Sequence, residues 1–126
     1  MAQPASKLGT VQWVDLTVPD APRVRDFYKA VVGWEPSGVD MGGYDDFNMM
    51  PPGAEKPTCG VCNARGENAN LPAQWLIYVP VANLADSIAA CERRGGRVVN
   101  RHSKTQCVIQ DPAGAVMMIY EEQKSP

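Results

Sequence analysis

The sequence contains the same pattern of residues twice, at an offset of about 62 positions. Trp13 stands twenty positions before Gly33 in the first copy, and Trp75 stands twenty positions before Gly95 in the second. In each copy a short apolar segment precedes a helical pattern, which a glycine ends. Further short apolar segments follow. Because either copy alone is too small to close a hydrophobic core, the duplication predicts one fold built from two modules.

The first copy, at about residues 9–64, is predicted to be a strand, a helix and three more strands. Residues 11–18 alternate between an apolar face and a mixed face, as in a half-buried strand. Asp20 is a suitable helix N-cap, and Gly33 is a suitable end for that helix. The expected apolar stripe of the helix is Val24, Phe27, Tyr28 and Val31. Two strands interrupted at residues 42–43 and a third near 57–64 complete the module.

A polar connector at residues 65–73 leads to the second copy at residues 74–122. Its first strand is expected at 74–81, with Asn83 as the N-cap of the following helix. The predicted fold class is therefore α+β. Two βαβββ modules with pseudo-twofold symmetry are expected to form one curved eight-stranded mixed sheet, in a single domain covering residues 1–126.

Charge and hydropathy exclude several classes of function. The formal net charge is -2 and the isoelectric point is near 5.3, whereas nucleic-acid and membrane-surface binding need a concentrated basic face. The first ten residues carry one lysine and lack an apolar stretch of signal-peptide length, and no segment approaches the roughly 20 apolar residues of a membrane span. We expect a cytoplasmic protein, with no nucleic-acid or membrane partner and with four reduced cysteines.

Several short motifs in both copies match a known superfamily. They lie at residues 13–16, 18–20, 27–28, 33–34, 75–79, 95–96 and 111–114. With these residues the sequence resembles the vicinal oxygen chelate superfamily, which includes glyoxalase I, bleomycin-resistance proteins and extradiol dioxygenases. The resemblance covers about residues 9–122. It implies a cup formed by the two modules, and it implies a homodimer.

Metal-using relatives hold a divalent ion in this cup through His or Glu on the first and last strands of each module. By the resemblance, these positions fall on Trp13, Leu76, Met118 and a residue near Cys62 or Asn63. The side chains of Trp, Leu and Met are not ligands for a hard divalent ion. The sequence also has a single histidine. It therefore predicts no metal site and no cofactor.

Two cysteines, Cys59 and Cys62, are spaced as in redox and zinc motifs. A redox pair needs its first cysteine at a helix N-terminus, and a zinc site needs a second Cys or His pair. These two cysteines fall in a predicted strand, where residues three apart point to opposite faces, and Cys91 and Cys107 are isolated. We interpret the pair as small structural residues.

Three residues are candidates for acid–base chemistry. Asp15 lies on the mixed face of the first strand, where we expect it to point into the cup; hydrogen bonding to backbone or to a partner subunit is an equally good interpretation. Tyr78 occupies a similar place in the second module. His102 falls in a polar loop, where most histidines are simply solvated.

Three functions remain open. The first is a small-molecule-binding protein without a metal, similar to the drug-sequestering resistance proteins. The second is a lyase or isomerase that uses Asp15, Tyr78 or His102 as acid and base. The third is an assembly protein with a collapsed cup. For the first, the candidate ligand-binding residues are Trp13, Asp15, Thr17, Asn63, Gln74, Leu76, Tyr78 and Met118.

Overall fold

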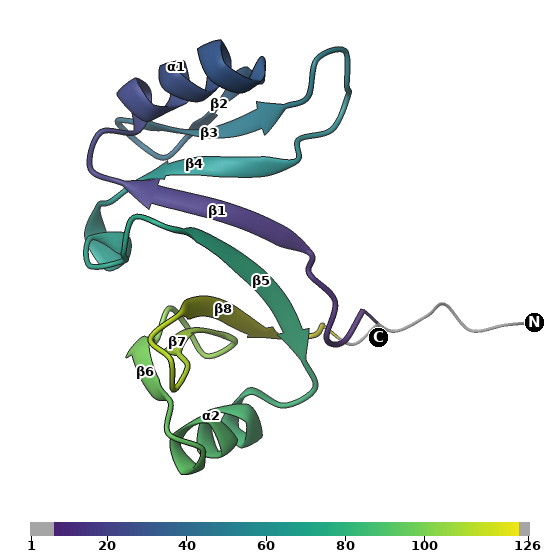
Figure 1. The fold of residues 1–126 in the computed structure, drawn as a ribbon, viewed down its shortest axis with the longest axis vertical. Coiled ribbons are helices and arrows are strands. Elements are labelled where there is room, and N and C mark those ends of the chain that lie inside the picture. The colour runs from purple at the N-terminus through teal and green to yellow at the C-terminus, as the bar shows by residue number, and fades with distance from the viewer. Residues whose placement is uncertain (1–6, 124–126) are drawn as a thin grey trace, which may run out of the picture. The chain divides into compact units, whose positions relative to one another are not determined.

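The computed structural model describes residues 7–123, so the first six and last three residues of the predicted domain lie outside it. The chain divides into two compact units. One consists of residues 13–76, and the other combines the start of the chain, up to residue 12, with residues 77 onward. Each unit is described by itself below (Figure 1). The single-domain organisation, with modules at 9–64 and 74–122, stays a prediction.

The unit at residues 13–76 is a four-stranded sheet covered on one face by a helix (Figure 1). Its elements are β1 (Trp13–Val18), α1 (Ala21–Val32), β2 (Glu35–Asp40), β3 (Asp45–Met50) and β4 (Cys59–Asn63). The strand order is β2-β3-β4-β1. β1 pairs with β4 in parallel, while β2–β3 and β3–β4 are antiparallel, so the sheet is mixed.

The second unit repeats this arrangement. Its elements are β5 (Trp75–Val81), of which the first two residues belong to the other unit, α2 (Leu84–Arg93), β6 (Arg97–Asn100), β7 (Gln106–Gln110) and β8 (Val116–Glu121). The order is β5-β8-β7-β6, with β5 and β8 parallel. The α+β class and the repeated strand–helix–three-strand order are thus confirmed. The connector also contains a short 3-10 helix, η1 (Gly66–Asn68), which was not predicted.

The helix boundaries follow the capping residues that the sequence indicated. The Asp20 carboxylate accepts a hydrogen bond from the backbone N–H of Arg23 at 3.2 Å, and the Asn83 side chain accepts one from Asp86 N at 3.0 Å. α1 ends at Gly33, whose φ of 86° is the left-handed conformation that glycine adopts without steric cost. The predicted caps are confirmed.

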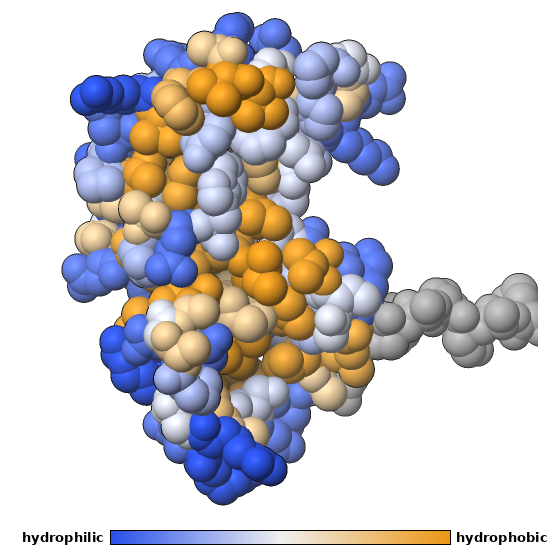
Figure 2. All heavy atoms as spheres, viewed as in Figure 1, coloured by the Kyte–Doolittle hydropathy of each residue, from blue (hydrophilic) through white to orange (hydrophobic). Residues whose placement is uncertain are grey.

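Helix α1 packs on its sheet through a narrower stripe than the sequence predicted. Val24 and Tyr28 contact the core cluster, but Phe27 is 57% exposed and Val31 is 64% exposed. The prediction that these two residues are core was wrong. Ala21, Val24 and Tyr28 are spaced i, i+3 and i+7 and therefore lie on one line along the helix, which leaves the neighbouring line in solvent. Hydrophobic surface over α1 is visible in the space-filling view (Figure 2).

Each unit has its own hydrophobic core between helix and sheet. In residues 13–76 the buried members are Leu16, Val18, Ala21, Phe47, Met49, Cys59 and Val61. In the other unit they are Leu84, Cys107 and Ile119, with Val81, Ile88, Val98, Ile109 and Met117 packed against them. Within residues 7–123, no helix is long and apolar enough to cross a membrane.

Candidate functional site

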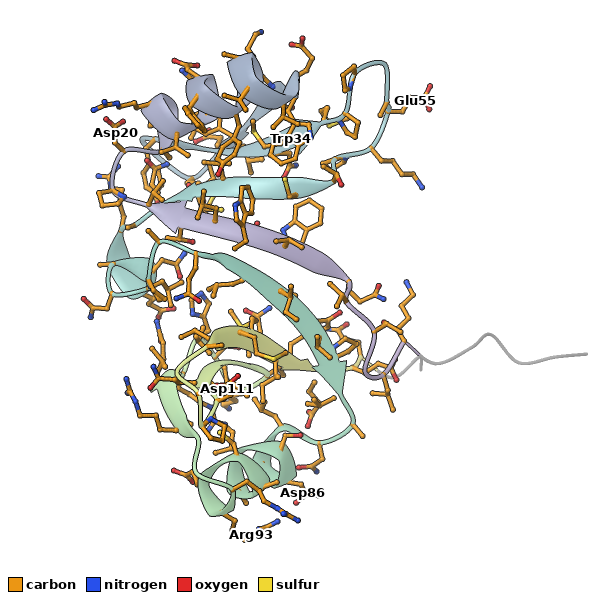
Figure 3. All side chains as sticks on the ribbon, in the orientation of Figure 1. Asp20, Trp34, Glu55, Asp86, Arg93 and Asp111 are labelled. Atoms are coloured by element: carbon orange, nitrogen blue, oxygen red, sulfur yellow. The ribbon has the colours of Figure 1, made fainter. Side chains whose placement is uncertain are left out.

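The mixed face of β1 lies on the side of the sheet away from α1. Leu16 and Val18 are buried in the core beneath the helix, so strand alternation directs Trp13, Asp15 and Thr17 to the opposite face. The parallel pairing with β4 continues this face across the sheet, because Asp15 pairs with Gly60 and Thr17 pairs with Cys62. On the next strand Asn48 pairs with the same glycine. The stick view shows the side chains on both faces of this sheet (Figure 3).

The structure brings two of the predicted site residues together. The indole N–H of Trp13 donates a hydrogen bond to Asp15 Oδ1, with 2.6 Å between the two heavy atoms. Both residues are half-buried. A hydrogen bond to a carboxylate is stronger than one between neutral groups, and partial burial protects it from competing water. The Asp15 carboxylate is therefore held in a defined orientation on this face.

Gly60 is a residue of this face that the sequence interpretation missed. A Cβ atom added to it would overlap Asp15 Oδ1 and would lie 3.3 Å from Asp15 Cγ. A glycine inside a strand is a known sign of a close approach by another group, and the sequence did contain that sign. The two cysteines near this glycine, Cys59 and Cys62, form the more conspicuous motif of the segment.

The two cysteines flanking Gly60 are held as neutral thiols. Cys59 is buried in the core, and burial followed by the charge of Asp15 raises the pKa of its thiol to about 11. Cys62 pairs with Thr17 and lies on the face of the sheet opposite to Cys59. Burial, followed by the charges of Asp15 and Asp46, raises the pKa of the Cys62 thiol above that of Cys59. Both are free in the structure. High thiol pKa values oppose nucleophilic or redox chemistry.

Asn63 has a structural role in the same unit. Its side-chain amide donates to the Asp45 carbonyl at 2.6 Å and to Asp46 Oδ1 at 2.9 Å, and its backbone N–H donates to that same carboxylate oxygen at 2.9 Å. These bonds tie the end of β4 to the start of β3. The assignment of Asn63 to a ligand stays a prediction, and its amide N–H groups already have protein acceptors.

Three other predicted ligand-binding residues of this unit differ in how far they are exposed to solvent. Thr17 is 3% exposed and Leu76 is 1% exposed, whereas Gln74 is exposed just before β5. Gln74 donates its backbone N–H to the Pro72 carbonyl. The role of these three in binding stays a prediction.

The remaining candidates lie in the second unit. Tyr78 on β5 is paired with Met118 on β8, so these two predicted residues are neighbours on one face. Met118 is 1% exposed. His102 lies in the loop between β6 and β7. Its Nδ1 atom is buried and, within the part of the chain that the structure describes, has no hydrogen-bond partner.

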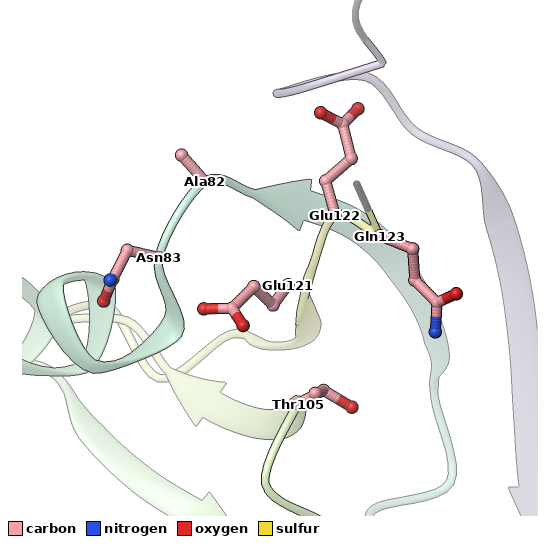
Figure 4. A pocket seen from close by; sticks show the side chains of 6 residues that line it. All are labelled: Ala82, Asn83, Thr105, Glu121, Glu122 and Gln123. Atoms are coloured by element: carbon pink, nitrogen blue, oxygen red, sulfur yellow. The ribbon is translucent and has the colours of Figure 1, made fainter. Parts of the chain in front are cut away.

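Two hollows within the units are lined by other residues. One of about 420 Å³ lies in the second unit between the start of α2 and the end of β8 (Figure 4). It is lined by Ala82, Asn83, Thr105, Glu121, Glu122 and Gln123. Another of about 340 Å³ lies beside α1 and is lined by Arg25, Asp26, Lys29, Pro36, Gly38, Asp45 and Phe47. Neither includes a predicted site residue.

By the resemblance, the metal-ligand positions fall on Trp13, Leu76, Met118 and a residue near Cys62 or Asn63, and the first three of these do not fit a metal ion. Trp13, Leu76 and Met118 offer an indole, an alkyl group and a thioether, none of which binds a hard divalent cation. Among residues 7–123, no three His, Cys, Asp or Glu side chains are grouped so that they could hold a metal ion.

A comparison with known protein families identifies the family of this chain. The model of the glyoxalase-like domain family matches residues 13–120, which is most of the chain. The chain belongs to this family. Comparison of this glyoxalase-like domain with curated protein sequences gives no match.

Solved structures similar to this glyoxalase-like domain share its fold. A hypothetical protein from Bacillus halodurans C-125 has a TM-score of 0.57 at 10% identity, covering 93% of this chain and 96% of that one. Methylmalonyl-CoA epimerase from Mycobacterium tuberculosis has a TM-score of 0.54 at 14% identity, covering 98% and 94%. A glyoxalase/bleomycin resistance protein/dioxygenase superfamily member from Vibrio splendidus 12B01 has 0.53 at 11%, covering 90% and 100%. At these identities the similarity shows the vicinal oxygen chelate fold alone.

Proposed function

We propose that this glyoxalase-like domain binds a small organic molecule without a metal ion. The binding surface is the face of the sheet in residues 13–76 that lies away from α1. The observation that carries the proposal is the hydrogen bond from the Trp13 indole to the Asp15 carboxylate. It places a large aromatic ring beside an oriented polar group, a combination that small-molecule sites use for contact area and for orientation.

The chemistry of this face limits the ligand. An ionised carboxylate only accepts hydrogen bonds, so a ligand group that contacts Asp15 has to be an N–H or O–H donor. The thiol of Cys62 on the same face is kept neutral and adds no competing charge. The indole supplies a flat apolar surface beside the carboxylate. A partly aromatic molecule with one or two hydrogen-bond donors fits this description.

Ligand screening by NMR tests the proposal. The indole N–H resonance of Trp13 in a ¹⁵N-labelled sample, assigned by its loss in Trp13→Phe, reports binding next to Asp15. Aromatic fragments with a donor, such as 2-phenylethylamine, are expected to shift this resonance. The donor-free counterpart ethylbenzene and the anion 3-phenylpropionate are expected to shift it less. If no donor-bearing aromatic compound in a fragment library perturbs the Trp13 resonance at millimolar concentration, the proposal is wrong.

The same proposal includes a homodimeric, cytoplasmic protein. A strand with unpaired backbone groups at a sheet edge favours association, and superfamily membership adds to that expectation. Light scattering at micromolar protein concentration tests the homodimer, and a monomer mass contradicts it. A monomer that also binds no fragment supports the assembly function with a partner of another kind.

A second candidate function, a lyase or isomerase, draws on the same hydrogen bond. A carboxylate oriented by a fixed donor is suited to remove a proton from a bound substrate, as a general base does. Tyr78 and His102 are the other candidate acid–base residues. Any fragment that binds can be incubated with the protein in D₂O and followed by NMR. Exchange of a carbon-bound proton that Asp15→Asn abolishes supports the enzyme; binding without exchange supports the binding protein.

A further inference from the structure

We infer that Gly60 is the residue that positions the Asp15 carboxylate, and that it thereby sets the specificity of the proposed site. Gly60 itself has no side chain to touch a ligand. It acts through Asp15, and the inference that it affects ligand binding rests on the proposed function.

The close approach of the two residues is the first step. Asp15 on β1 and Gly60 on β4 are paired in the parallel ladder. Any Cβ atom at position 60 would overlap Asp15 Oδ1 and would come within 3.3 Å of Asp15 Cγ. The carboxylate therefore occupies the space where the side chain of another amino acid would stand.

Backbone geometry does not account for a glycine at this position. Eight glycines of the described chain have positive φ values, where a side chain would be strained, and Gly60 is not one of them. Its strand conformation is open to any residue, and glycine weakens a strand interior because it orders more backbone and packs no side chain. The room needed by the Asp15 carboxylate is the feature of the structure that explains this glycine.

The Trp13 indole holds the same oxygen of the carboxylate that lies against Gly60. Its N–H lies 2.6 Å from Asp15 Oδ1, the same oxygen that a Cβ at position 60 would displace. Displacing that oxygen while the indole stays in place alters the distance or the angle of the N–H···O hydrogen bond. Because a hydrogen bond weakens steeply with distance and angle, loss of the space at Gly60 uncouples Trp13 from Asp15.

A pH titration of the Trp13 indole resonance measures this coupling without a ligand. In the wild-type protein the Nε1–H shift is expected to move as the Asp15 carboxyl group titrates, and Asp15→Asn is expected to remove that movement. Gly60→Ala is expected to reduce the amplitude by half or more. The matched control is Gly38→Ala, another strand glycine, where a Cβ would come 2.9 Å from Asp45 Oδ2. That variant is expected to keep the wild-type titration.

Thermal stability gives a second readout. Gly60→Ala is expected to lower the melting temperature by roughly 5 °C or more, and the loss is expected to shrink by more than half when Asp15→Ala is also present, because the overlap is then relieved. Unchanged titration in Gly60→Ala, or an equal loss of melting temperature in both backgrounds, overturns the inference.

Ligand binding separates this inference from the proposed function. If a donor-bearing fragment binds the wild type, Gly60→Ala is expected to weaken it at least tenfold, while Gly38→Ala binds as the wild type does. Equal affinity of Gly60→Ala and wild type overturns the claim on specificity. If no fragment binds any variant, the proposed function and the specificity claim fail together, while the titration and melting results still decide whether Gly60 positions Asp15.

Discussion

Glu121 on β8 accepts a hydrogen bond at its Oε1 atom from the backbone N–H of Leu84, the first residue of α2, at 2.9 Å. The bond joins the last strand of the second unit to the start of its helix, at the edge of the hollow seen in Figure 4. It also satisfies one of the backbone donors that the first turn of a helix leaves without an intrahelical partner.

Removing this bond is expected to destabilise the second unit. Glu121→Ala leaves the N–H of Leu84, a residue that is 2% exposed, without its acceptor, which costs about 1–2 kcal/mol in the free energy of unfolding. Glu121→Gln keeps a side-chain oxygen acceptor and is expected to lose less than half as much. Urea unfolding of the two variants measures the difference, and equal losses contradict the assigned role.

The aromatic contacts of α1 predict that two adjacent residues contribute very differently to the stability of the protein. The Tyr28 ring lies 5.6 Å from the Trp34 ring and 5.3 Å from the Trp75 ring, measured between centroids. Tyr28→Ala is therefore expected to cost about 2–4 kcal/mol. Phe27→Ala is expected to cost about 1 kcal/mol or less, because Phe27 is mostly exposed. Chemical denaturation tests both, and a larger loss for Phe27→Ala than for Tyr28→Ala would show that the helix face is wrongly assigned.

The raised pKa of Cys59 predicts that stability falls at high pH. The thiol ionises near pH 9.0 ordinarily but near 11 in the folded protein, so between these values the unfolded chain binds fewer protons than the folded one. The contribution of the neutral Cys59 thiol to the free energy of unfolding is complete below pH 9. It is lost as the pH rises through about 11. Between pH 8 and 10.5 the wild type should lose about 2 kcal/mol more than Cys59→Ala does. If urea titrations show that the stability of both proteins changes equally with pH, this prediction is wrong.

Treatment that removes metal ions is expected to leave the stability and the ligand binding of the protein unchanged. Protein purified without a His tag or added metal should contain well under one equivalent of zinc, nickel, manganese or iron by elemental analysis. Its melting temperature and its fragment binding should be the same before and after dialysis against EDTA, because the side chains of Trp13, Leu76 and Met118 are not metal ligands. Stoichiometric metal that resists dialysis would contradict the argument from the donor set.

The sequence predicted the elements well because local signals specify them. The caps at Asp20 and Asn83 and the glycines that end the helices act over a few residues, and these interactions appear in the structure as expected. The exposure of Phe27 was not predictable in the same way. A helical repeat of apolar residues shows that one side of α1 faces the sheet, but the width of the buried stripe depends on how the helix lies on that sheet.

The candidate site was predictable only in part. Strand alternation correctly grouped Trp13 with Asp15 on one face. Their hydrogen bond and the space at Gly60 depend on side-chain conformations and on the register between β1 and β4, which lie more than forty residues apart in the sequence. Alternation within one strand carries no information about which residue of a distant strand lies opposite Asp15.

Residues just before β1 belong to the second unit, and this affects the order in which the chain can fold during synthesis. The N–H groups of Gly9 and Gln12 donate to the carbonyls of Pro80 and Tyr78 on β5. A ribosome makes these two donors about seventy residues before it makes their acceptors. Residues 13–76 can therefore form their own sheet before the hydrogen-bond acceptors of the preceding segment on β5 have been synthesised. Pairing of that segment is one of the late events in the folding of the nascent chain.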